Sequence, residues 1–177
     1  INTLAVKIAK EAASEFSTST WPRFVAGAMG PTTKTLSVTG GITFEELEEN
    51  FYKQAYSLVK AGSDLILLET SQDMLNVKAA TIGINRAFEE LNTVLPVMIS
   101  GTIEPMGTTL AGQSIEAFYI SIEHIKPLSV GLNCATGPEF MTDHIRSLSD
   151  LATSYVSCYP NAGLPNSLGE YDQTPED

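Results

Sequence analysis

Short apolar runs alternate with amphipathic helical patterns along most of the chain, and this alternation limits the possible folds more than any other feature. Each apolar run ends in polar or glycine-rich sequence, and between the runs apolar residues recur every three or four positions. The pattern predicts repeated βα units around a parallel sheet. Its five predicted strands are Phe24 to Ala28, Leu65 to Leu68, Val97 to Ile103, Val130 to Leu132 and Tyr155 to Tyr159.

Signals for helix starts stand between the predicted strands. Thr43 and Glu46 have the spacing of a capping box, in which each side chain accepts a hydrogen bond from the other residue's backbone N–H. Asp73 and Ser114 are capping residues for the next two helices, and Pro138 opens a fourth. We expect these four helices to cover one side of the sheet.

Both ends of the sequence fall within a helical pattern. Residues 1–16 begin directly on an apolar stripe with no capping residue before it, while Thr174 and Pro175 have the form of a helix start. We expect an incomplete set of βα units on this basis, although ordinary frayed ends of a domain give the same pattern.

Two parallel α/β architectures fit the alternation: a doubly wound open sheet and a closed (β/α)8 TIM barrel. Polar residues directly after successive strands would converge at the mouth of a barrel, where active sites of that fold lie. The sequence has no glycine fingerprint for a dinucleotide or a P-loop, which weakens the doubly wound alternative. The barrel is favoured, and its mouth would hold Glu69, Asn133, Cys134 and Asn161.

Charge and composition exclude several classes of function. The net charge of −11, without any basic run, opposes binding of nucleic acid. No apolar run is long enough to cross a membrane, and two cysteines are too few for a disulfide framework. We expect a cytoplasmic protein with reduced thiols that binds neither nucleic acid nor membrane.

Cys134 and Glu69 are the strongest candidates for chemistry. A thiol between a strand and a helix start suits a nucleophile or a metal ligand, although a lone cysteine is often a small buried residue. A carboxylate at the end of a buried strand needs a cationic partner, either in the protein or on a ligand, and a ligand ammonium would fit Glu69. Asn161 faces the same mouth, but its Pro-Asn-Ala-Gly context also suits a simple turn.

Five segments together resemble the homocysteine-binding domain of cobalamin-dependent methionine synthases, in the same order and over essentially the whole chain. The resemblance implies that residues 1–177 are a partial barrel domain with about five of the eight βα units, the third to the seventh strands. The segments are FVAGAMGPT at 24–32, DLILLET at 64–70, ISGTI at 99–103, GLNC at 131–134 and YPNAGLPN at 159–166.

The same resemblance implies roles for three residues. Cys134 matches the first of three zinc-binding cysteines, whose other two have no counterpart in this sequence. Glu69 matches the glutamate that contacts the homocysteine amino group. Asn161 matches an asparagine that contacts the substrate site and can be the fourth zinc ligand before substrate arrives.

The implied activity is methyl transfer from methylcobalamin to the zinc-bound thiolate of homocysteine, which gives methionine. The folate- and cobalamin-binding domains would lie elsewhere in the full-length chain, and the present residues alone would be inactive. Two alternatives remain open: a cobalamin-independent methyltransferase that uses betaine or S-methylmethionine, and a non-catalytic barrel fragment.

Overall fold

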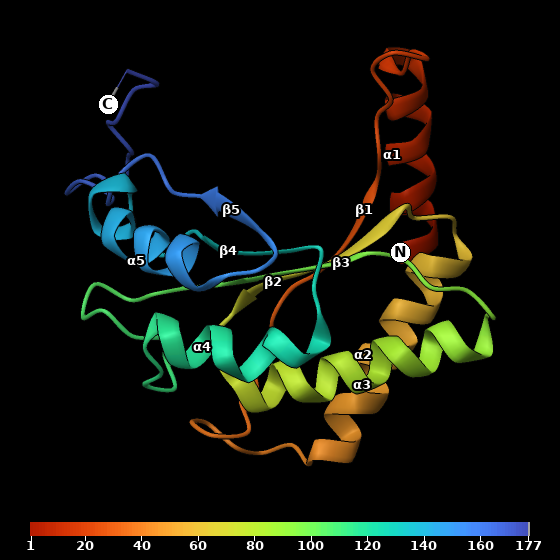
Figure 1. Cartoon of the computed structure of the whole chain (residues 1–177), viewed down its shortest axis with the longest axis horizontal. Coiled ribbons are helices and arrows are strands. Elements are labelled where there is room, and N and C mark those ends of the chain that lie inside the picture. Colours follow the sequence, from red (N-terminus) through yellow and green to blue (C-terminus); the bar gives the residue numbers. More distant parts are fainter. Residues whose placement is uncertain (177) are drawn as a thin grey trace.

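Five parallel strands form a single sheet in the computed structural model, which describes residues 1–176. The strands lie in the order in which they occur along the chain, and each pairs in parallel with its neighbours (Figure 1). All five predicted strands are confirmed. They are β1 (Ala26–Met29), β2 (Leu65–Ser71), β3 (Val97–Gly101), β4 (Ser129–Asn133) and β5 (Tyr155–Tyr159).

The predicted helices and their start signals are also confirmed. Thr43 and Glu46 form the reciprocal capping box, and the side chains of Asp73 and Ser114 accept backbone N–H bonds at the next two starts. Pro138 occupies the first turn of the last helix. The helices are α1 (Asn2–Phe16), α2 (Phe44–Lys60), α3 (Met74–Glu90), α4 (Ile115–Ile122), the short 3-10 helix η1 (Glu123–Ile125) and α5 (Pro138–Leu151).

The first predicted strand is shifted by two residues at its start. Phe24 is largely exposed, and the Val25 backbone N–H donates to the Asp64 carboxylate at 2.7 Å instead of joining a ladder. Strand pairing therefore begins at Ala26, opposite Leu65. The Asp64 carboxylate thus takes the place of one backbone hydrogen-bond acceptor between the strands.

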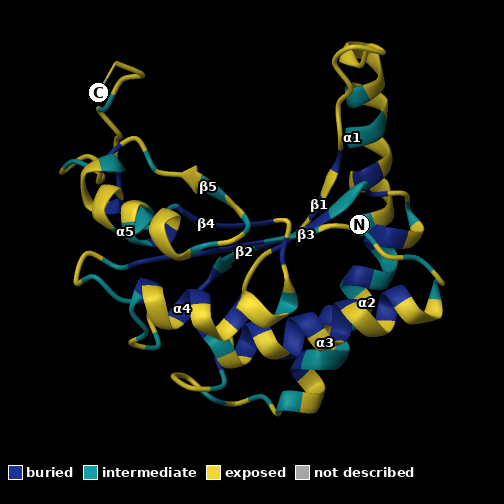
Figure 2. Cartoon of the chain, in the orientation of Figure 1, coloured by how far each residue is buried: buried dark blue, intermediate teal, exposed yellow. Residues whose placement is uncertain are grey.

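Helices cover one face of the sheet and leave the other face open. In Figure 1, α2, α3 and α4 lie on one side, while the opposite side opens between α1 and the C-terminal segment. Ile66 and Leu68 of β2 are buried against the helices, whereas Leu65 and Leu67 alternate with them and are half-buried. Figure 2 shows the resulting pattern, with buried residues concentrated between the sheet and its helices.

This arrangement is that of a partial (β/α) barrel. A doubly wound sheet reverses its strand order at a switch point and carries helices on both faces. Here the order runs from β1 to β5 without reversal. Within residues 1–176, β1 and β5 each have one unpaired edge, and no helix is both long and apolar enough to span a membrane.

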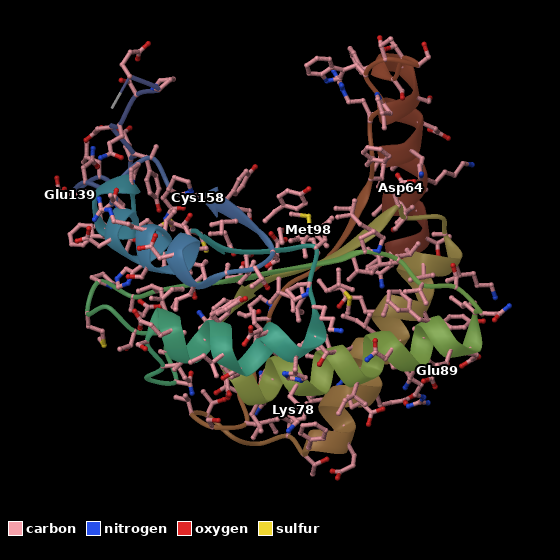
Figure 3. All side chains as sticks on the ribbon, in the orientation of Figure 1. Asp64, Lys78, Glu89, Met98, Glu139 and Cys158 are labelled. Carbon is pink, nitrogen blue, oxygen red and sulfur yellow. The ribbon has the colours of Figure 1, made fainter. Side chains whose placement is uncertain are left out.

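The Lys10 ammonium joins α1 to the sheet through a 2.6 Å ion pair with Asp64, which Figure 3 labels beside α1. Burial of the carboxyl group acts against ionisation, but the bonds from Lys10 and the Val25 N–H outweigh it and lower the pKa of Asp64. The ionised form therefore stabilises the folded chain.

We expect Asp64→Asn to reduce stability at neutral pH by roughly 1 kcal/mol, because the ion pair is partly exposed. Ionised Asp64 contributes its full stabilisation at pH values above the usual pKa of a carboxyl group. This stabilisation is lost as the pH falls through the lowered pKa. Thermal unfolding of the two proteins should therefore differ at neutral pH and converge in acid. An equal difference at both pH values would contradict this account.

Candidate functional site

The carboxyl ends of β4 and β5 are tied together by backbone hydrogen bonds. The N–H of Cys134 donates to the carbonyl of Tyr159 at 2.9 Å, and the N–H of Asn161 donates to the carbonyl of Thr136 at 3.1 Å. The loop that carries Asn161 therefore lies against the loop that carries Cys134. The structure thus brings these two predicted site residues to one edge of the sheet.

Glu69 enters the same region from β2. Its half-buried side chain lines a cavity of about 360 Å³ on the open face, together with Met98, Ser100, Asn133 and Tyr159. Figure 3 shows Met98 on this open side of the sheet. The Glu69 carboxylate forms no ion pair or side-chain hydrogen bond with any other residue in the described range 1–176. A cationic group in this cavity would supply the partner that a partly desolvated carboxylate needs.

A β-bulge determines where Glu69 points. Leu68 pairs with Ile99 and Ser71 pairs with Gly101, so β2 has Glu69 and Thr70 where β3 has a single residue. Thr70 has φ of 59°, a left-handed conformation that is rare for a β-branched side chain. Bulges commonly redirect a side chain beside an active site, and this one lies directly at the candidate carboxylate.

Asn133 connects the ends of three strands. Its Oδ1 accepts from the Thr70 N–H at 3.0 Å and from the Ser100 hydroxyl at 2.6 Å. Its Nδ2 donates to Thr70 Oγ1 at 2.8 Å and to Cys134 Sγ at 3.3 Å. Thr70, the residue after Glu69, and Cys134 are therefore linked through a single buried amide.

Cys134 alone does not make a metal site. Its thiol is half-buried, and both Cys134 and Ala135 have positive φ, at 41° and 61°. A catalytic zinc site has three protein ligands, and no group of three His, Cys, Asp or Glu side chains within the described residues could hold a metal ion. The residues present therefore do not fit zinc by themselves.

Cys158 is the other cysteine of the chain. It is exposed because β5 is an edge strand of the described sheet. Its Sγ still lies 3.8 Å from Met141 Sδ, and partial burial raises the pKa of the thiol. Cys158 also lines the cavity that contains Glu69, so its removal is a control for the loss of a thiol near the site other than Cys134.

Two glycines allow the loops after β4 and β5 to meet. A Cβ at Gly137 would lie 2.5 Å from the Cα of Gly163, which itself has φ of 85°. The Gln173 side chain packs on the other side of Gly163, where an added Cβ would lie 3.1 Å from it. The position of Asn161 relative to Cys134 therefore depends on the close approach of two backbones.

We expect Gly137→Ala to destabilise the protein by about 1–3 kcal/mol, because the added methyl group must push the two loops apart. The separation should also break the bond from the Asn161 N–H to Thr136. Gly30→Ala is the matched control, since a Cβ there meets nothing within 4 Å. Equal unfolding temperatures for the two variants would show that the loop contact is dispensable.

Sequence reasoning missed Thr70 and Ser100, and it noted Asn133 only as a polar residue at a strand end. Thr70 and Ser100 lie 63 and 33 residues from Asn133, so no local spacing reveals their contacts with its amide. The one available signal was that all three are polar residues at the ends of apolar runs.

Comparison with known proteins identifies the family. Residues 1–177 match the family described as homocysteine S-methyltransferase. The chain belongs to this family.

Three crystal structures of the homocysteine methyltransferase MmuM from Escherichia coli share the fold. The metallated form has a TM-score of 0.77 at 19% identity, covering 92% of this chain and 58% of that chain. The apo form has a TM-score of 0.70 at 20% identity, covering 89% and 56%. The oxidized form has a TM-score of 0.66 at 20% identity, covering 88% and 53%. This chain therefore spans just over half the length of the MmuM chain.

Proposed function

We propose that the protein containing this chain transfers a methyl group to the sulfur of homocysteine, and that residues 1–177 are part of its homocysteine-binding barrel domain. The observation that carries the proposal is the Glu69 carboxylate, which lines a cavity without a cationic partner in the described residues. Homocysteine has the ammonium group that such a carboxylate would bind.

The two ends of homocysteine would be held by different strand ends. Glu69 on β2 would accept hydrogen bonds from the amino group, and the substrate sulfur would lie toward Cys134 after β4. We further propose that Cys134 is one of three zinc ligands, with the other two outside these residues. Asn161 would contact the substrate site and could occupy the fourth zinc position before homocysteine binds.

For the methyl donor we propose methylcobalamin, with folate- and cobalamin-binding domains elsewhere in the full-length protein, which acts in the cytoplasm. The five segments that resemble methionine synthases support this choice. The family match supports equally a second candidate, a cobalamin-independent homocysteine methyltransferase that uses betaine or S-methylmethionine. In either case we expect residues 1–177 alone to be inactive, because the described residues 1–176 contain no group of three side chains that could hold a metal ion.

Calorimetric titration of the whole protein with homocysteine tests the proposal. We expect homocysteine to bind more tightly than homoserine, in which oxygen replaces sulfur, because a thiolate is a stronger zinc ligand than a hydroxyl group. Methionine should then form with methylcobalamin, whereas formation only with S-methylmethionine or betaine would select the second candidate. Absence of homocysteine binding would leave a non-catalytic barrel as the remaining interpretation.

A further inference from the structure

Strained backbone gathers at two of the strand ends. Five non-glycine residues within 1–176 have positive φ, and three of them, Thr70, Cys134 and Ala135, occur where β2 and β4 end. The other two, Asn92 and Lys126, follow helices, where a left-handed residue is common. Away from helix ends, a positive φ at a non-glycine residue persists only where neighbouring groups restrain the backbone, and such residues cluster at functional sites.

The Asn133 amide supplies the restraint on both strained segments. An amide side chain has two donor hydrogens and an oxygen with two acceptor positions, and the four hydrogen bonds of Asn133 use all of them. The residue is 7% exposed, and its partner Ser100 is 4% exposed. Asn133 therefore cannot turn toward a ligand without breaking a bond to one of these strand ends.

Thr70 is held by two of these bonds, one to its backbone N–H and one to its hydroxyl. Because Thr70 is the second residue of the bulge, its conformation determines the direction of the preceding Glu69 side chain. Asn133 Nδ2 also fixes the Cys134 thiol from the side of β2. One amide thus sets the relative placement of the candidate carboxylate and the candidate sulfur ligand.

We propose that Asn133 is a positioning residue of the homocysteine site. It orients Glu69 through Thr70 and orients Cys134 directly, and its own hydrogen-bonding positions are all used by protein groups although it lines the cavity. This inference rests on the proposed function, since Glu69 and Cys134 are the groups that would meet homocysteine and zinc. It adds a residue whose effect on binding is transmitted through the hydrogen bonds to Thr70 and Cys134.

The test uses the whole protein and two measurements. We expect Asn133→Ala to weaken homocysteine binding about tenfold or more in calorimetry, since several hydrogen bonds that hold the site are lost. Amide hydrogen exchange should become faster at residues 65–71 and 129–137, while exchange in residues 26–29 of β1 stays unchanged. Unchanged amide hydrogen exchange at residues 65–71 and 129–137 in Asn133→Ala would overturn the positioning role, whatever the affinity for homocysteine.

Two more conservative substitutions at Thr70 test the positioning role of Asn133 if Asn133→Ala does not fold. Thr70→Val removes the hydroxyl that Asn133 binds and keeps the side-chain shape, whereas Thr70→Ser keeps the hydroxyl. We expect the valine variant to lose about tenfold in homocysteine affinity and the serine variant to restore most of it. Thr81→Val is the matched control, because that buried hydroxyl donates to the Lys78 carbonyl within α3.

The outcomes separate this inference from the proposed function. Wild-type affinity in Thr70→Val, or a similar loss in Thr70→Val and Thr70→Ser, would overturn the role of Asn133 while leaving homocysteine binding intact. A loss of affinity in Thr81→Val as large as that in Thr70→Val would reduce the effect to general destabilisation and also overturn it. If the wild-type protein binds no homocysteine, the proposed function fails and the inference fails with it.

Discussion

Cys134→Ala should remove zinc from the whole protein and reduce methyl transfer to homocysteine by at least about a hundredfold. Changes in groups that merely support a metal ligand already cost about 10–100-fold, and loss of a ligand should cost more. Zinc content by atomic spectroscopy and the rate of methionine formation check the expectation. Both follow from the proposal that Cys134 is one of three protein ligands.

Cys158→Ala is the matched control for this prediction. It removes the other thiol of the chain, which lies against Met141 on the edge strand and has a raised pKa. Cys158 lines the same cavity as Glu69 but is not a proposed zinc ligand, so the zinc content should stay close to that of the wild-type protein. Stoichiometric zinc in Cys134→Ala would contradict the proposed ligand.

Glu69→Gln should weaken homocysteine binding by about ten- to a hundredfold, because a hydrogen bond to a charged group contributes about 1.5–3 kcal/mol and 1.4 kcal/mol is a factor of ten. The substitution keeps the size of the side chain and removes only its charge. Calorimetry with homocysteine gives the change in affinity directly.

A substrate analogue makes this prediction specific for the amino group. The compound 4-mercaptobutanoate is homocysteine without its amino group, so the wild-type protein and Glu69→Gln should bind it equally. Glu89→Gln, on the exposed side of α3, removes one carboxylate elsewhere and should leave both affinities unchanged. A loss of affinity for 4-mercaptobutanoate in Glu69→Gln would assign the carboxylate a different role.

The fold was largely predictable because each strand is a short apolar run and most helices have a local start signal. Thr43, Asp73 and Ser114 act within their own helical turn, so their role can be read from neighbouring residues. The predicted boundaries of the strands were less accurate because residues distant in sequence determine where strand pairing begins and ends. Asp64 takes the N–H of Val25 before β1, and the bulge extends β2 from Leu68 to Ser71.

The candidate site was predictable only in part. Glu69, Cys134 and Asn161 could be named because each follows an apolar run, and parallel strands bring such positions to one edge. The contact between Gly137 and Gly163 and the hydrogen bonds of Asn133 join loops that are far apart in sequence. These contacts depend on the register between strands, which no local pattern specifies.

The central claim is that one edge of the sheet binds homocysteine by its amino group at Glu69 and presents its sulfur toward Cys134. A crystal structure of the whole protein with homocysteine and zinc tests it most directly. The account predicts the amino nitrogen within hydrogen-bonding distance of the Glu69 carboxylate, and zinc bonded to both Cys134 Sγ and the substrate sulfur. Homocysteine bound elsewhere, or Glu69 paired with a cationic side chain from another part of the protein, would contradict it.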